Sequence, residues 1–229
     1  MIQFRYIGTD EFAQVGAELL AERIDEAVAE RGVCHLAVSG GRAPWELFGV
    51  LGRRDLKWTQ VHIWQVDERV APDRDVDRNS VGLKTSLLAL APVPESNIHW
   101  MDVTSDDLES AAAAYAEELD RVCGGVLDIV HLGLGADGNT ASWSPGDPVS
   151  DVDDADVAIS AEFNGFVRMT LTPRCVNRAR GRIFLVTGGD KERAIDELTN
   201  GGDIPAAKVT PAATVAIVAL PAPLHEDLD

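Results

Sequence analysis

The sequence predicts an α/β fold in which a mostly parallel sheet is covered by helices on both faces. Short apolar runs alternate with amphipathic segments along the 229 residues, and this alternation is typical of parallel strands joined by crossover helices. Apolar residues make up 45% of the chain, which is enough for a globular core. This length favours one α/β domain, so we expect a single domain over residues 1–229.

The individual elements follow from the spacing of apolar residues. Residues 11–31 have apolar side chains at helical intervals and stop before Gly32, so they predict an amphipathic helix. Further helices are predicted to begin near Pro44 and to cover 79–90, 105–122 and 190–198. The predicted strands are the apolar runs 33–38, 61–66, 126–132, 182–187 and 214–220.

The charge balance excludes several classes of partner. Asp plus Glu number 38 and Lys plus Arg number 20, giving a formal net charge of −18. Nucleic acids and anionic membranes need a basic face, so we expect neither as a partner. Three cysteines, Cys34, Cys123 and Cys175, form no CxxC pair, which argues against a disulfide framework or a zinc ribbon. With no signal-peptide pattern and no long apolar run, we expect a cytoplasmic protein.

Four predicted strands end in a glycine-rich or charged cluster. The carboxyl ends of the strands form the ligand crevice in an open parallel sheet, so four such ends predict a site. In the first cluster, residues 39–44 (Ser-Gly-Gly-Arg-Ala-Pro), two glycines allow a sharp turn. We expect Ala43 at the helix cap, where it leaves N–H groups free for an anion. An ordinary strand–helix turn is the alternative.

The next two clusters carry acidic and amide side chains. Asp67, Glu68 and Arg69 follow the strand at 61–66, as either a solvated loop or a catalytic cluster. Their place at the carboxyl edge of the sheet favours catalysis. In residues 133–142, three glycines make a tight loop that places Asp137 close to Asn139. A glycine-rich turn with polar tips is the alternative there.

Two cations outside these loops are candidate phosphate ligands. Arg168 precedes a short apolar stretch, and Lys191 follows a pair of glycines. Lys191 falls in the first turn of a predicted helix, where a cation opposes the helix dipole, and this favours an anionic ligand nearby. The acidic stretch 151–156 lacks the spacing of a calcium loop, so we expect a surface loop and no metal site.

Taken in order, these segments resemble the 6-phosphogluconolactonase family, within the wider glucosamine-6-phosphate isomerase group. The ordered set carries the resemblance, which extends from Ser39 to Lys191 and comprises residues 39–44, 64–69, 78–80, 132–142, 168–170 and 187–191. The resemblance implies a Rossmann-like α/β fold and hydrolysis of 6-phospho-D-glucono-1,5-lactone in the pentose phosphate pathway. It implies no metal and no organic cofactor.

The resemblance also assigns roles to individual residues. Asp67 and Arg69 are expected to face the sugar ring, and Asp137 and Asn139 to lie at the reacting carbonyl. The expected catalytic residues are thus Asp67, Asp137 and Asn139. The expected substrate and phosphate ligands are Ser39, Gly40, Gly41, Arg42, Arg69, Arg168 and Lys191.

One departure from the family pattern bears on the chemistry. The family loop reads Asp-Gly-His, and its histidine is the expected proton-transfer residue, but this chain has Asn139. Asparagine accepts no proton at neutral pH, although it can orient water or donate to an oxyanion. We therefore expect Asp67 or Asp137 to act as the base, with a pKa raised by the site. No obvious substitute exists among the five histidines His35, His62, His99, His131 and His225.

Three functions are consistent with these residues. The first is a lactonase, with activity reduced by the loss of the histidine. The second is an isomerase or deaminase acting on an amino-sugar phosphate, but Arg69 and Pro145 favour the lactonase branch. The third is a non-catalytic homologue that binds sugar phosphates. In each case we expect a small sugar phosphate as the partner, and a monomer or weak homo-oligomer.

Overall fold

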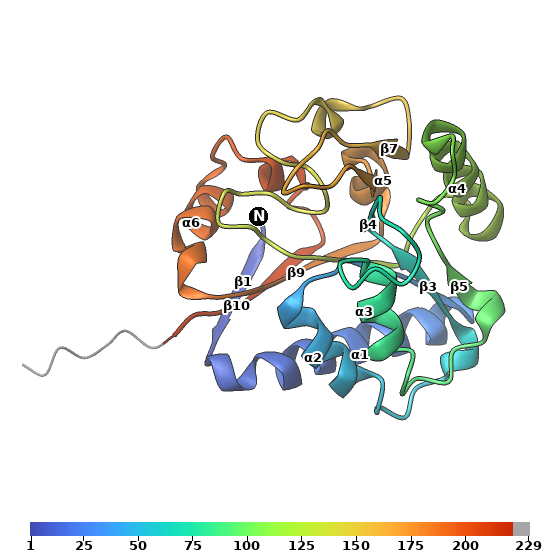
Figure 1. Cartoon of the computed structure of the whole chain (residues 1–229). Coiled ribbons are helices and arrows are strands. Elements are labelled where there is room, and N and C mark those ends of the chain that lie inside the picture. Colours follow the sequence, from blue (N-terminus) through green and yellow to red (C-terminus); the bar gives the residue numbers. More distant parts are fainter. Residues whose placement is uncertain (222–229) are drawn as a thin grey trace, which may run out of the picture.

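A seven-stranded sheet lies at the centre of the computed structural model, which describes residues 1–221 (Figure 1). Its strands follow the order β1-β10-β9-β6-β2-β3-β5, and each neighbouring pair is parallel. The strands are β1 (Gln3–Ile7), β2 (Cys34–Val38), β3 (Val61–Gln65), β5 (Ile98–His99), β6 (Ile129–Leu132), β9 (Gly181–Thr187) and β10 (Thr214–Ala219). The predicted mostly parallel α/β fold is therefore confirmed, whereas a single domain over 1–229 stays a prediction.

Helices cover both faces of this sheet (Figure 1). One face carries α1 (Phe12–Arg31), α2 (Arg42–Leu51) and α3 (Asn79–Thr85), and the other carries α4 (Leu108–Cys123), α5 (Pro173–Arg178) and α6 (Glu192–Asn200). The sheet separates two apolar clusters. In β2, Leu36 packs into the cluster on the side of α1, α2 and α3, and its neighbour Ala37 packs into the cluster on the side of α4, α5 and α6. All five residues of β2 are buried, so inner strands appear in the sequence as continuous apolar runs.

A second sheet of three strands lies at the carboxyl edge of the first. It has the order β4 (Asp67–Arg69), β8 (Arg168–Leu171), β7 (Val157–Ile159), and both pairs are antiparallel. Asp67 pairs in register with Thr170, and Arg69 with Arg168. Of the two interpretations of this charged segment, the solvated loop is therefore wrong: the segment is a strand, and its pairing joins two motifs that are about a hundred residues apart in sequence.

Two helix starts differ from the prediction. Gly41, and not Ala43, is the N-cap of α2, with φ +137°, a backbone conformation that suits glycine. The helix therefore begins at Arg42 and Pro44 is its third residue. The helix predicted from residue 190 begins as the 3₁₀ turn Gly189–Lys191, and α6 itself starts at Glu192.

The other 3₁₀ turns of the described residues are Thr9–Glu11, Trp58–Gln60, Glu95–Asn97, Pro148–Asp151 and Pro205–Lys208.

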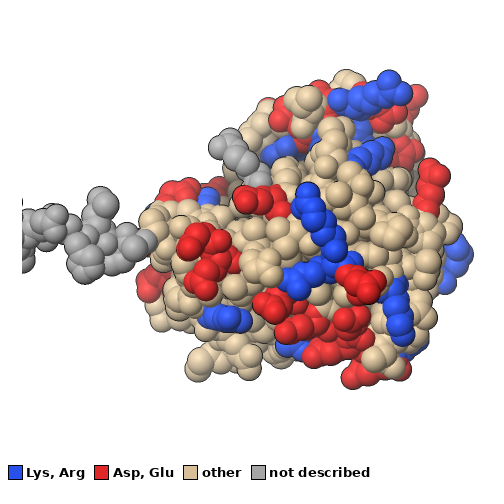
Figure 2. Space-filling model, turned by 90° about the horizontal axis from the view of Figure 1, so that it is seen from below, with Lys and Arg blue, Asp and Glu red and all other residues tan. Residues whose placement is uncertain are grey.

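Charges of both signs lie side by side on one face of the molecule (Figure 2). On the face shown in Figure 2, Lys and Arg side chains lie among Asp and Glu side chains rather than in a separate basic patch. Within residues 1–221, no helix is both long and apolar enough to cross a membrane.

Candidate active site

A cleft of about 530 Å³ opens where the carboxyl ends of β2, β6 and β9 meet the second sheet. This volume is within the usual range for small-molecule sites. The cleft collects residues from every segment that carries the family resemblance, although Asp137 itself is not among the lining residues. The predicted site residues that line it are Ser39, Gly40, Gly41, Asp67, Arg69, Asn139, Arg168 and Lys191.

The turn between β2 and α2 presents its backbone to this cleft. Gly40 and Gly41 line the cleft, directly before the first turn of α2, whose leading N–H groups have no partner within the helix. Ser39 is 5% exposed, and its hydroxyl Oγ has no hydrogen-bond partner among the described residues. The turn therefore offers both an unused hydroxyl and backbone donors. The side chain of Arg42, expected to bind phosphate, lies outside the part of the chain that the structure describes.

Asp67 lines the cleft but is largely buried, with 7% of its surface exposed. Its Oδ2 accepts a hydrogen bond of 2.7 Å from the hydroxyl of Ser142. Burial raises the pKa of the Asp67 carboxyl, while the Ser142 hydrogen bond and the Arg168 guanidinium oppose that rise. A carboxyl with a raised pKa at the wall of a cleft has the properties of a general base.

Arg69 and Arg168 lie opposite each other on the paired strands β4 and β8. Each guanidinium packs on an aromatic ring, with Arg168 at 5.4 Å from the centroid of Phe163 and Arg69 at 5.7 Å from that of Phe166. Arg168 donates to the carbonyl of Phe163 at 3.3 Å. Its buried Nε has no hydrogen-bond partner among residues 1–221, so this N–H group is free to donate to a ligand.

Lys191 reaches the cleft from the turn that leads into α6. Its Nζ lies 3.0 Å from Oδ2 of the exposed Asp190, and its side chain is 20% exposed. The Lys191 ammonium lowers the pKa of the Asp190 carboxyl through this hydrogen bond. Lys191 is the N-cap residue of α6, one position before the first turn in which it was predicted to lie. Among the described residues, the exposed Asp190 is therefore the one carboxylate that would compete with a bound anion for the Lys191 ammonium.

The glycine-rich loop after β6 folds back on itself. Gly135 N–H donates to the carbonyl of Asn139 at 2.8 Å, and Gly138 N–H donates to the carbonyl of Gly135 at 3.0 Å. A Cβ on Gly135 would lie 2.2 Å from Oδ1 of Asn139, so the asparagine side chain lies directly against the backbone of this glycine. The loop thus holds Asn139 at the cleft wall.

Asp137 has a different environment from Asp67. It is exposed, it is not among the cleft-lining residues, and its Oδ1 accepts the backbone N–H of Asn139 at 3.1 Å. The structure thus does not bring the two predicted carboxylates together in the cleft. Asp137 orients the loop that carries Asn139.

None of the histidines in the described part of the chain lines the cleft. His131, from β6, is buried, its ring packs edge-on against Phe48, and burial lowers its pKa to about 3. It accepts the backbone N–H of Ser39 at 3.3 Å. His131 is therefore the packed histidine that its place in a strand predicts. His225 lies outside the described residues.

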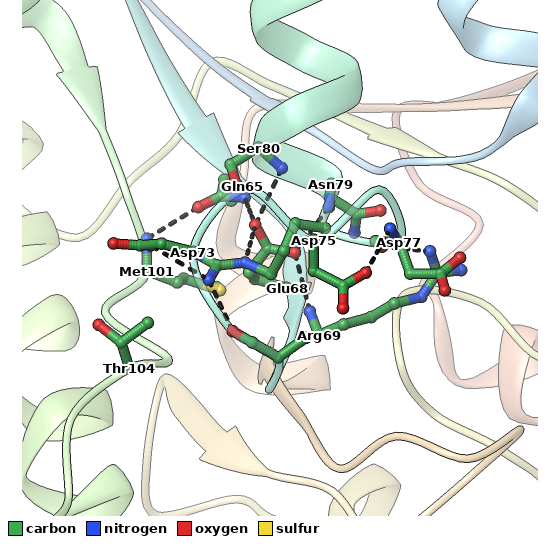
Figure 3. A network of polar contacts seen from close by, with 12 residues as sticks. Gln65, Glu68, Arg69, Asp73, Asp75, Asp77, Asn79, Ser80, Met101 and Thr104 are labelled. Atoms are coloured by element: carbon green, nitrogen blue, oxygen red, sulfur yellow. Dashed lines mark hydrogen bonds and ion pairs between the residues drawn. The ribbon is translucent and has the colours of Figure 1, made fainter.

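A network of polar contacts surrounds Glu68, the residue of β4 that follows Asp67 (Figure 3). Glu68 is fully buried and accepts the backbone N–H groups of Asn79 at 2.7 Å and Ser80 at 2.9 Å. Its Oε2 also accepts Gln65 Nε2 at 3.0 Å and lies 3.1 Å from Nε of Arg78. Burial raises the pKa of the Glu68 carboxyl, but the Gln65 and Ser80 hydrogen bonds and the Arg78 charge outweigh it and lower the pKa. Glu68 is thus an ionised structural group rather than a base.

Two residues that contact Asp67 are missing from the sequence-based assignment. Ser142 donates to Asp67 from 75 positions away, and Asn79 donates its Nδ2 to the Asp67 carbonyl at 2.9 Å. Both lie inside the segments that carry the family resemblance. Only the pairing of distant segments reveals what they contact.

Comparison with known proteins assigns the chain to a family. The family model described as Glucosamine-6-phosphate isomerases/6-phosphogluconolactonase matches residues 8–218. A 6-phosphogluconolactonase from Synechocystis is 37% identical over 182 residues, covering 77% of this chain and 75% of the relative. A 6-phosphogluconolactonase from Rhizobium meliloti is 32% identical over 199 residues, covering 83% of this chain and 84% of the relative.

Solved structures agree in fold. The 6-phosphogluconolactonase of Thermotoga maritima superposes with a TM-score of 0.88 at 22% identity, covering 96% of this chain and 100% of that one. A monomeric glucosamine-6-phosphate deaminase superposes with a TM-score of 0.84 at 18% identity, covering 96% and 97%. Both branches share the fold, so the sequence matches carry the assignment. On this evidence, the chain belongs to the glucosamine-6-phosphate isomerase/6-phosphogluconolactonase family.

Proposed function

We propose that the protein hydrolyses 6-phospho-D-glucono-1,5-lactone to 6-phosphogluconate. The observation that carries the proposal is the Asp67 carboxyl, buried at the wall of a cleft that also collects Arg168 and Lys191. A sugar phosphate lactone needs both features, a base near its carbonyl carbon and cations for its phosphate. The Synechocystis and Rhizobium relatives that bear the lactonase name support the same reaction.

In the proposed reaction, Asp67 is the general base. A water molecule attacks the C1 carbonyl carbon, and its proton passes to the Asp67 carboxylate. The carbonyl oxygen becomes an oxyanion, which the Asn139 amide, held at the cleft wall by its loop, stabilises as a donor. The C1–ring oxygen bond then breaks, and the protonated Asp67 returns its proton to the leaving ring oxygen. A positioned base of this kind contributes roughly 10²–10⁴ in rate.

The phosphate is proposed to bind in the part of the cleft that the turn between β2 and α2 forms with Arg168 and Lys191. Its ligands there are the Ser39 hydroxyl, the backbone N–H groups of the Gly40–Gly41 turn, Arg168 and Lys191. The formal net charge of −18 repels a dianion at a distance, so these local donors must outweigh the overall field. We therefore expect 6-phosphogluconate to bind far more tightly than gluconate.

A second candidate is a sugar-phosphate-binding protein without turnover, and Asn139 favours it because the family loop normally carries a histidine there. An assay of lactone hydrolysis with the spontaneous rate subtracted distinguishes the two. We expect a rate that scales with protein concentration, and a higher rate for Asn139→His. If the parent protein adds nothing to the background while 6-phosphogluconate still binds, the binding function replaces the lactonase.

A further inference from the structure

We propose that Asn79 is a positioning residue that fixes the phosphate end of the cleft relative to the Asp67 end. This inference rests on the proposed lactonase function. Asn79 is 7% exposed and projects from the first position of α3. Its Nδ2 donates to the backbone carbonyl of Asp67 at 2.9 Å. One side of the amide is thus tied to the residue that carries the proposed base.

The other side of the Asn79 amide packs on the phosphate turn. A Cβ built on Gly40 would lie 1.9 Å from Asn79 Oδ1 and 2.3 Å from its Cγ. The positive-φ glycines of the described chain include Gly41 but not Gly40, so the backbone conformation of Gly40 does not call for glycine. Close approach of Asn79 is what demands glycine at position 40.

The Glu68 carboxylate fixes the backbone of Asn79 (Figure 3). The Asn79 N–H donates to Glu68 Oε1 at 2.7 Å, and Glu68 follows Asp67 directly in β4. The contacts therefore close a ring that runs from Asp67 through Glu68 to Asn79 and back to the Asp67 carbonyl, with Gly40 packed against it. The Glu68 carboxylate is fully buried, so this ring has little freedom to shift.

A fixed distance between the two ends matters only to a substrate that uses both. The phosphorylated lactone is held by its phosphate and reacts at its carbonyl, and a misplacement of about 1 Å can cost on the order of 10² in rate. Unphosphorylated glucono-1,5-lactone does not use the phosphate end. The structure therefore assigns Asn79 a role in the advantage of the phosphorylated over the unphosphorylated lactone.

The test is a double-variant cycle at Asn79 and Gly40. Asn79→Ala should lower kcat/KM for the phosphorylated lactone by at least about tenfold and for the unphosphorylated lactone by less than about threefold. Gly40→Ala should cause a similar selective loss, because its new Cβ displaces the Asn79 side chain. In the Asn79→Ala background that clash is gone, so Gly40→Ala should add less than about threefold. Asn79→Ser provides a second, polar truncation.

The control is Thr85→Ala, an exposed position on the same helix whose hydroxyl bonds only to carbonyls of its own helix. It should leave both activities unchanged, and thermal unfolding should show every variant to be folded. Equal losses with the two lactones, or additive effects of Asn79→Ala and Gly40→Ala, would overturn the positioning role.

A binding measurement separates this inference from the proposed function. In calorimetry, Asn79→Ala should weaken the binding of 6-phosphogluconate by at least about tenfold and the binding of inorganic phosphate by less than about threefold. That result supports the positioning role even if the parent protein shows no turnover, in which case only the lactonase proposal fails. Equal weakening of both ligands would overturn the positioning role even in an active lactonase.

Discussion

Replacing Asp67 by asparagine removes a proton acceptor while almost preserving the shape of the side chain. The new Oδ1 can still accept the Ser142 hydroxyl, which lies 2.7 Å from Asp67 Oδ2 in the parent protein. The loss in kcat should therefore report the missing base rather than a rearranged cleft. We expect a decrease of roughly 10²–10⁴, the usual contribution of a general base.

The same substitution should stabilise the fold. Burial raises the pKa of Asp67 in the folded chain above its unfolded value, so the folded state binds more protons between those two values. The free energy of unfolding therefore falls as the pH rises through that window, and the ionised carboxylate destabilises the protein at neutral pH. Asp67→Asn removes this charge, and we expect a higher Tm at pH 7 together with the loss of activity.

The assay combines initial rates of lactone hydrolysis, corrected for the spontaneous reaction, with thermal unfolding of the same preparations. Asp137→Asn is the matched control, because Asp137 is exposed and bonds to the backbone of its own loop. It should lower the rate far less than Asp67→Asn does. An Asp67→Asn variant that keeps its parent rate, or an Asp137→Asn variant that loses more, would refute the assignment of the base.

Two further substitutions test the phosphate end and the buried network. Lys191→Ala should weaken 6-phosphogluconate roughly ten- to a hundredfold in calorimetry, since a charge-assisted hydrogen bond is lost, and should leave gluconate binding unchanged. Lys84→Ala, which removes an equal charge from the Trp100 ring away from the cleft, should affect neither ligand; equal weakening by both variants contradicts the assignment. Glu68→Gln should lower the free energy of unfolding in urea by about 3 kcal/mol, because it leaves the buried Arg78 with only the exposed Asp73 as a carboxylate partner. The exposed pair of Arg23 and Glu26 is the control, and Glu26→Gln should cost less than about 1 kcal/mol; equal costs would argue against the network.

The inner strands could be predicted because their own residues carry the signal. β2, β6 and β9 are buried on both faces, so their apolar character is visible in any short window. β1 and β5 were missed because β1 has exposed positions along its length and β5 has only two residues. β4 was missed for another reason: its charges are compensated by partners distant in sequence, which a local pattern does not reveal.

The candidate site could likewise be predicted only where a local motif carries the signal. The resemblance placed Asp67, Arg168 and Lys191 in one site, and the structure brings all three to one cleft. The resemblance also places Asp137 at the reacting carbonyl, but the turn directs its carboxylate to a backbone N–H. The role of Ser142 is not visible in the sequence, because its partner Asp67 is 75 positions away. Which residue of a motif faces the cleft depends on loop geometry that spacing alone does not specify.

The pH dependence of kcat/KM for the phosphorylated lactone tests most directly whether Asp67 replaces the missing histidine. In the parent protein, the rate should fall at low pH with a pKa above that of an ordinary aspartate, because burial raises the pKa of Asp67. Asn139→His should add an ionisation near pH 6–7, where histidine titrates. Asp67→Asn should remove the acid limb of the profile along with most of the rate. An acid limb that persists unchanged in Asp67→Asn would contradict the account, because the proton would then be accepted by another group.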